Sequence, residues 1–240
     1  MRLYIDMSAI FDFLKSTIGK KVLMALTGFV LAGFVLIHML GNLQFFISPE
    51  AINSYAHHLQ SLPPVILWAF RGTLLLSLIL HVWMAILVSR DKASARPQKY
   101  EVNSNVQASY ASRTMMMGGI ILLCFICFHI AHFTLKVAPA HYTPEAFLLS
   151  PEDGPSFNVP NVYKMMVDGF KNTWISVFYI VGTAALCFHL SHGVSSMFQT
   201  VGLRNETWRY RLNGLALIYG VGVFAGFAII PISVMMGWRS

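Results

Sequence analysis

Charge is scarce in this chain. Only 11% of its 240 residues are Asp, Glu, Lys or Arg, whereas an ordinary soluble domain carries about 25%. Hydrophobic residues make up 56%. This composition excludes a disordered chain, a coiled coil and most soluble enzymes, and it predicts an integral membrane protein. The three cysteines are too few for a disulfide framework, so they say little about the redox compartment.

Long apolar runs predict five membrane-spanning helices, because a span needs about 20 mostly apolar residues. The runs cover residues 22–47, 64–89, 114–137, 173–198 and 212–236. The connections are short, apart from one over residues 138–172. We therefore expect an all-α bundle of five transmembrane helices that forms a single domain over residues 1–240.

The N-terminal segment differs from a secretory signal peptide. Asp6 and Asp12 lie among its cations, and the apolar run that follows is too long for the hydrophobic region of such a signal. Residues 8–21 instead predict a short amphipathic helix on the membrane surface. The side chains expected to face lipid are Ile10, Phe11, Phe13, Leu14 and Ile18. Both Met1 and Met7 are candidates for the first residue.

The basic residues gather in alternate connections. Those at the N-terminus, between the second and third spans and between the fourth and fifth spans hold twelve of the 17 cations. By the positive-inside rule the N-terminus is cytoplasmic and the C-terminus lies outside. The net charge of +7 therefore reports topology, and no nucleic-acid partner is expected. The twelve are Arg2, Lys15, Lys20, Lys21, Arg90, Lys92, Arg96, Lys99, Arg113, Arg204, Arg209 and Arg211.

Nine histidines are unusual in so apolar a chain, and four of them lie at two depths on four different spans. His38 and His129 occupy matching depths in the outer half, while His81 and His189 lie near the cytoplasmic ends of their spans. Bis-histidine haem ligation requires two neutral imidazoles that face each other across a helix bundle. Two level pairs therefore predict two b-type haems stacked across the membrane.

An interhelical hydrogen bond and a transition-metal site are alternative interpretations of the histidines. A single membrane histidine is more often an interhelical hydrogen-bonding residue, but four at two matched depths favour a cofactor. The HxxH pairs completed by His132 and His192 also allow a transition-metal site, although the spans lack the carboxylates that metal transporters usually add. Depth favours His129 over His132 as a ligand and does not separate His189 from His192. No CxxCH motif is present, which excludes covalent c-type haem.

Cations near the predicted haems are candidate partners of their propionates. Arg71 lies well inside the second span, where it would pair with a propionate of the outer haem or extend to the outer headgroups. The sequence does not choose between these two roles. For the inner haem it offers Ser89, Arg90, Arg113, Lys20 and Lys21 without distinguishing among them.

A quinone site needs an apolar slot with a few polar groups at its head. Polar side chains cluster at the outer end of the first span and in the connection after it, and the alternative is an ordinary solvated loop. The quinone candidates are Asn53, Tyr55, His57 and His58, with Asn42 and Gln44 nearby.

The sequence around the histidines carries a wider pattern. Residues 16–28 and 34–42 lie in and before the first span, residues 52–57 and 61–63 in the first outer connection, and residues 80–81, 127–129 and 178–189 on the later ligand helices. Together these stretches resemble the five-helix, dihaem cytochrome b subunit of succinate dehydrogenases and fumarate reductases. The resemblance extends from about residue 8 to residue 237 and rests on the order and spacing of the histidines.

The resemblance implies an electron-transfer membrane anchor of a succinate:quinone oxidoreductase in the bacterial inner membrane. It implies His81 with His189 on the haem nearer the cytoplasm and His38 with His129 on the outer haem. It also implies a flavoprotein subunit and an iron–sulfur subunit docked on the cytoplasmic side. A quinone, which we expect to be menaquinone, would exchange electrons with the membrane subunit, and that subunit would not act on succinate by itself.

The chain departs from the family pattern at one position. Some members carry a membrane glutamate near the fourth-span ligand for proton movement, whereas Cys187 stands there in this chain, so such a proton route is not expected. Two rival interpretations stay open. One is a dihaem quinone cytochrome of another respiratory complex, which would want two well-separated histidines on one span. The other is a haem-free membrane transporter.

Overall fold

The computed structural model describes residues 7–95, 110–137 and 161–239. These residues form helices and no β-strand, which confirms the predicted all-α fold. Several residues used in the sequence argument lie outside the described residues: Met1, Arg2, Asp6, Arg96, Lys99 and His141, together with the side chains of Met7, Ile10 and Arg113.

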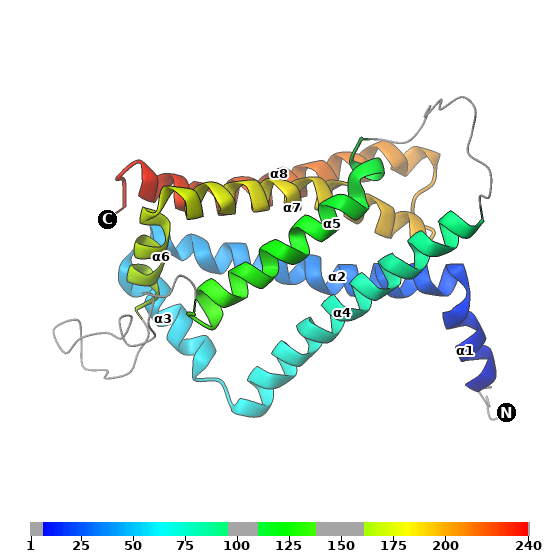
Figure 1. Ribbon diagram of the computed structural model, residues 1–240, viewed down its shortest axis with the longest axis horizontal. Helices are drawn as coiled ribbons and strands as arrows, with labels where there is room; N and C mark the ends of the chain where they lie inside the picture. The colour runs from blue at the N-terminus through cyan, green and yellow to red at the C-terminus, as the bar shows by residue number, and fades with distance from the viewer. Residues whose placement is uncertain (1–6, 96–109, 138–160, 240) are drawn as a thin grey trace.

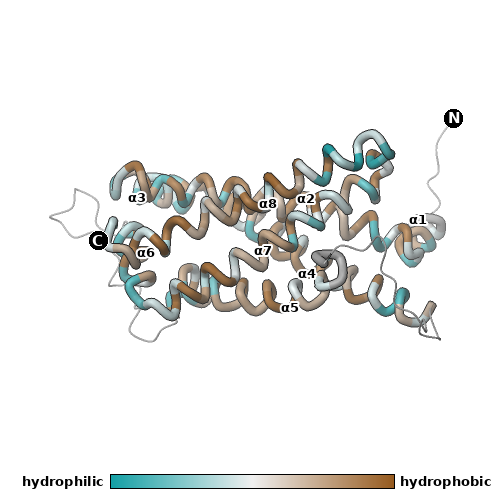
Figure 2. The backbone as a smooth tube through the Cα atoms, turned by 90° about the horizontal axis from the view of Figure 1, so that it is seen from above, coloured by the Kyte–Doolittle hydropathy of each residue, from teal (hydrophilic) through white to brown (hydrophobic). Residues whose placement is uncertain are grey.

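Five of the described helices are long and apolar enough to cross a membrane, which makes the chain a multi-pass membrane protein. They are α2 (Thr17–Asn42), α4 (Pro64–Ser94), α5 (Tyr110–His129), α7 (Thr173–Thr200) and α8 (Glu206–Met235). A 3-10 turn, Leu43–Phe46, continues α2, and a π-helical turn, Ile130–Thr134, continues α5. Each helix overlaps its predicted span. Hydrophobic residues line the middle of the bundle and hydrophilic residues its two ends (Figure 2).

The predicted surface helix over residues 8–21 is two elements. Helix α1 (Met7–Lys15) ends before Ser16, whose extended backbone turns the chain and whose hydroxyl accepts a hydrogen bond from the Gly19 amide at 3.0 Å. This cap starts α2, so Ile18 belongs to the first span. A Cβ at position 19 would lie 1.9 Å from the Phe13 carbonyl oxygen, so only glycine fits where α2 leaves α1.

Two shorter helices form in segments that the sequence analysis treated as loops. Helix α3 (Pro49–Gln60) follows the first span, and α6 (Val162–Lys171) precedes the fourth. They pack against each other at one end of the bundle, opposite α1 (Figure 1). We name these ends the α3–α6 end and the α1 end. The core beneath α3 and α6 consists of Phe45, Ile52, Met166, Val167, Phe170, Tyr179, Ile230 and Val234.

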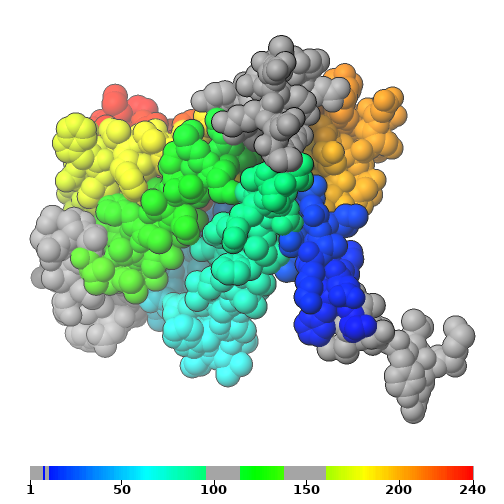
Figure 3. Space-filling view, turned by 45° about the vertical axis from the view of Figure 1, so that its right-hand side comes forward, coloured from blue at the N-terminus to red at the C-terminus, as the bar shows by residue number. Residues whose placement is uncertain are grey.

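The long helices pack unevenly. The most extensive helix–helix interface joins α7 and α8, while α5 packs mainly on α7 and α4 mainly on α2. Helix α4 runs exposed along one face of the molecule, between α5 and α1 (Figure 3). Its large apolar side chains, such as Leu75, Ile79 and Trp83, are more than half exposed, which suits a helix in contact with lipid.

Candidate functional site

The four histidines selected from the sequence form two facing pairs. His38 on α2 lies opposite His129 on α5, with ring centroids 5.8 Å apart and ring planes at 76°. His81 on α4 lies opposite His189 on α7, with centroids 6.2 Å apart and planes at 64°. All four side chains are half-buried. The partners are those that the depth argument pairs, and each pair joins two different helices.

The ring spacing in both pairs suits a metal ion between the two imidazoles. Metal–imidazole nitrogen bonds are about 2 Å long, so two rings on opposite sides of one ion have centroids roughly 6–6.5 Å apart. The measured separations of 5.8 Å and 6.2 Å lie at or just below this range. The steep angle between the ring planes is no obstacle, because each ring can turn about its own metal–nitrogen bond.

The helices that carry each pair are held apart. Because α4 packs mainly on α2 and α5 mainly on α7, neither α4 with α7 nor α2 with α5 forms a principal interface. One position a turn from His189 is open: a Cβ at Gly193 on α7 would meet no atom within 4 Å. The histidine side chains thus reach toward each other from separated helices, as a flat cofactor between those helices requires.

The surroundings of His81 leave one ring nitrogen free for a metal. Its Nδ1 lies 3.0 Å from the Met24 carbonyl oxygen, which can only accept, so Nδ1 carries the proton and Nε2 the lone pair. This second bond fixes the ring orientation, as it does for metal-bound histidines in general. Gly28 makes room for the ring, since a Cβ there would lie 3.1 Å from His81 Cε1. Across the pair, His189 Nδ1 is buried without a hydrogen-bond partner among the described residues.

In the pair His38–His129, side chains contact the ring nitrogens, whereas a backbone carbonyl contacts His81. His129 Nδ1 lies 3.3 Å from the hydroxyl of Tyr179 on α7, and the fully buried His132 places its own Nδ1 2.9 Å from the same hydroxyl. His38 Nε2 lies 3.2 Å from the Asn42 amide, which also donates to the His38 carbonyl at 2.8 Å. A ligand on His38 Nε2 would replace the first of these contacts, and the second would keep the amide satisfied.

Arg71 stacks within its own helix. Its guanidinium lies 5.2 Å from the ring centroid of Trp68, and both side chains are exposed. Because Trp68 is nearly one turn closer to the α3–α6 end, the cation extends toward that end of the bundle. This position favours the interpretation in which Arg71 reaches the headgroups.

The four quinone candidates do not converge in one place. Asn53 is buried: its amide oxygen accepts from the Tyr163 amide at 3.0 Å, and its nitrogen donates to Asn161 at 3.3 Å, so it joins α3 to α6. Tyr55 packs on α2, where a Cβ at Gly41 would lie 2.6 Å from its ring. The side chains of His57 and His58 are exposed on the last turn of α3.

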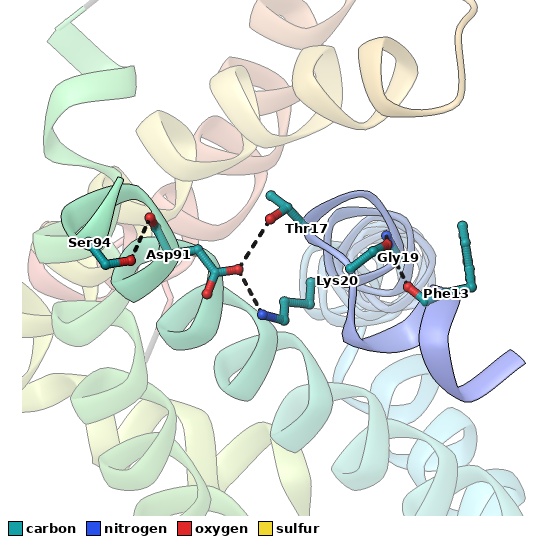
Figure 4. A network of polar contacts seen from close by, with 7 residues as sticks. Phe13, Thr17, Gly19, Lys20, Asp91 and Ser94 are labelled. Carbon is teal, nitrogen blue, oxygen red and sulfur yellow. Dashed lines mark hydrogen bonds and ion pairs between the residues drawn. The ribbon is translucent and has the colours of Figure 1, made fainter. Parts of the chain in front are cut away.

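At the α1 end, an ion pair ties the first two spans together. Lys20 on α2 lies 2.7 Å from the Asp91 carboxylate on α4, and Thr17 donates to the same oxygen at 3.4 Å (Figure 4). Lys20, one of the candidates for the inner propionates, is therefore already paired. Asp91 escaped the sequence analysis because the predicted span ends at residue 89.

A second polar cluster at this end surrounds Arg204, which the sequence analysis used only as a topology signal. The half-buried guanidinium donates to Gln199 at 2.6 Å and to Asn213 at 3.4 Å, and Asn213 also accepts from Ser195. Its Nε is buried without a hydrogen-bond partner among the described residues. The cation is thus held by neutral groups, and those on α7 lie about two to three turns beyond His189.

No family model, curated protein or solved structure matches this chain. The geometry of its own residues therefore carries the functional argument.

Proposed function

We propose that the chain is the membrane anchor and electron-transfer subunit of a succinate:quinone oxidoreductase, holding two b haems. The observation that carries the proposal is the pair of facing histidine couples, His38 with His129 and His81 with His189, at centroid distances of 5.8 Å and 6.2 Å. A b haem held by two histidines supplies one-electron chemistry at its iron. Two such groups at different depths form a route for electrons across the bundle.

In this proposal, neighbouring residues hold His81 in the orientation that a ligand needs. The Met24 carbonyl holds His81 in the tautomer that presents Nε2, and Gly28 leaves room for its ring. Arg204, half-buried among neutral partners toward the α1 end, is a candidate cation for the acidic groups of the inner haem. These contacts support a resident cofactor more directly than they support a transported ion, because they orient side chains rather than form a path.

The succinate:quinone assignment rests on the family resemblance in addition to the histidine geometry. In this proposal a flavoprotein subunit and an iron–sulfur subunit dock at the α1 end, which faces the cytoplasm of a bacterial cell. Support for this orientation comes from the described cations at the α1 end, which exceed those at the α3–α6 end. At the α1 end they are Lys15, Lys20, Lys21, Arg90, Lys92, Arg204, Arg209 and Arg211, and toward the α3–α6 end Arg71, Lys136, Lys164, Lys171 and Arg239.

An absorption spectrum of the purified protein tests the haem proposal. We expect b-type bands in the reduced-minus-oxidised difference spectrum and two haems per chain by pyridine haemochrome assay. The His38→Ala and His81→Ala substitutions should each remove one haem, and redox titration should show that the two variants lose different ones. The His192→Ala substitution on the same face as His189 should leave both haems in place.

Three outcomes would contradict parts of the proposal. A wild-type protein without b-type bands would leave the haem-free transporter as the better interpretation. Loss of the same haem in the His38 and His81 variants would overturn the pairing. Two haems without any association with succinate-oxidising subunits in native membranes would favour a cytochrome of another respiratory complex.

A further inference from the structure

Tyr179 on α7 lies between His129 and His132, at the end of α5. Its ring is buried in the core beneath α3 and α6, and its hydroxyl lies 3.3 Å from His129 Nδ1 and 2.9 Å from His132 Nδ1. His129 and His132 are three residues apart, and both face Tyr179 on α7. Tyr179 lies within the stretch 178–189 of the family resemblance, but the sequence analysis gives it no role, and the proposed haem ligation does not use it directly.

The ring proton of His129 can be assigned by counting donors and acceptors. To bind a metal, His129 must present an unprotonated Nε2, so its single ring proton resides on Nδ1. The Tyr179 oxygen then accepts from His129. The nearer His132 Nδ1, at 2.9 Å, also contacts this oxygen, and its tautomer sets whether it donates or accepts.

The surroundings of Tyr179 are apolar. Aromatic rings pack around the tyrosine ring with centroid distances of 5.1–6.2 Å, and they belong to Phe125, Phe128, Phe133, Phe170 and Phe178. The residue is only 6% exposed. A hydrogen bond in so apolar a setting is stronger than one exposed to water.

We propose that Tyr179 is a positioning residue for the outer haem ligand: its hydroxyl oxygen accepts a hydrogen bond from Nδ1–H of His129 and thereby fixes the tautomer and ring orientation of that histidine. This inference rests on the proposed haem function. A hydrogen bond to the far nitrogen of a metal-bound histidine raises the basicity of the ligand. Tyr179 therefore strengthens the bond from His129 to iron and favours the oxidised form of the outer haem over the reduced one.

The Tyr179→Phe substitution tests this role because it removes the hydroxyl and keeps the packed ring. We expect the midpoint potential of the outer haem to shift to a more positive value, and its affinity to fall by about 10-fold, the lower end of the effect of losing such a partner. The haem held by His81 and His189 should keep its potential, which shows within the same sample that the bundle is folded. Low-temperature electron paramagnetic resonance should show altered g values for the outer haem only.

Tyr219→Phe is the matched control. Its hydroxyl donates to the Ala32 carbonyl at 2.6 Å. Within the described part of the chain, its ring makes no stacking contact with any of the four histidines. This variant should leave both haem potentials unchanged. Replacing Tyr179 with 3-fluorotyrosine, whose oxygen is a weaker acceptor, should shift the outer potential in the same direction as phenylalanine but by less.

The failures of the two proposals are distinguishable. If the wild-type protein binds no haem, the proposed function fails. If the wild type holds two haems and Tyr179→Phe changes neither the potential nor the resonance of the outer one, the role of Tyr179 is refuted while the haem function stands. An equal shift of both haems, or a shift in the Tyr219 control, would likewise overturn it.

Discussion

Single atoms decide whether each of the four histidines can act as a ligand. The Met24 carbonyl and the Tyr179 hydroxyl each occupy an Nδ1 atom, so His81 and His129 present Nε2. The partner of His81 is a backbone carbonyl, whereas the partner of His129 is a side chain, so a point substitution can remove the hydrogen bond only at His129. Asn42 shows the opposite arrangement, since it lies against the Nε2 of His38.

The contact between Gly28 and His81 gives a prediction at this scale. A Cβ at position 28 would lie 3.1 Å from Cε1 of His81, so Gly28→Ala should push the ring by a few tenths of an ångström and Gly28→Val by more. We expect the inner haem to bind about 10-fold more weakly in the valine variant, as for other losses of ligand orientation. Haem content and redox titration measure this effect.

Gly33→Ala is the control on the same helix, because its Cβ would meet no atom within 4 Å. Gly28→Ala and Gly33→Ala each replace a helical glycine and gain a similar helix propensity. A difference in haem content between these two variants therefore reports the contact with His81. Equal haem content in the position-28 and position-33 variants would contradict the prediction.

Among the elements, the α7–α8 pair depends on one close approach. A Cβ at Gly220 on α8 would lie 2.8 Å from the Cys187 backbone carbonyl and 2.5 Å from the Ser191 hydroxyl on α7. Backbone cannot yield as a flexible side chain does, so Gly220→Ala must separate the two helices.

We expect Gly220→Ala to destabilise the protein by about 1–3 kcal/mol, the usual cost of overpacking a core, with a lower melting temperature in detergent. Gly222→Ala, two residues away, would meet no atom within 4 Å and should be neutral or slightly stabilising. A Gly220 variant as stable as the Gly222 variant would show that α7 and α8 pack less closely than described.

The elements also show what the sequence could and could not predict. The five spans follow from apolar composition, which dominates over any local detail. Helix α3 was missed although Ser48 and Pro49 are ordinary start signals, an N-cap and a first-turn proline. Helix α6 has only ten residues and was hidden in a long polar connection. Short amphipathic helices acquire their stability from packing, here of Ile52 on α3 and Phe170 on α6, and packing is not written in local sequence.

The facing of the histidines was predictable to the same degree, because depth along a span fixes which histidines are level. Their role as haem ligands stays a prediction. The rotation of each helix about its axis decides which other side chains face them, and no spacing rule gives that rotation for an aromatic residue in an apolar span. The contact of Tyr179 with His129 was therefore not predicted, although Tyr179 lies in the stretch 178–189, and the approach of Arg204 to Asn213 was not predicted either.

As a whole, the molecule has two chemically different ends. The α1 end carries most of the described cations, whereas the α3–α6 end carries three exposed tryptophans, Trp68, Trp174 and Trp238. Tryptophan prefers the interface between lipid and water. The two ends thus suit the two membrane surfaces, and the charge difference between them is the basis of the proposed orientation.

Accessibility of introduced cysteines tests this orientation. In a background where Cys124, Cys127 and Cys187 are replaced by alanine, Gln60→Cys on α3 should react with a membrane-impermeant maleimide in intact cells. Lys92→Cys at the α1 end should react only after the cells are opened, because that end faces the cytoplasm in the proposed orientation. The opposite pattern of labelling would reverse the topology.

Under the proposed haem function, the order of the four histidines along the chain has a consequence for biosynthesis. Each pair takes one histidine from the first two spans and one from the third or fourth, so a ribosome must deliver α5 before the outer pair is complete. The inner pair must wait for α7. A nascent chain halted after α5 would therefore contain the complete pair His38–His129 and His81 without its partner. In the proposed protein, haem would then bind to the outer pair before the inner pair, in the order of translation.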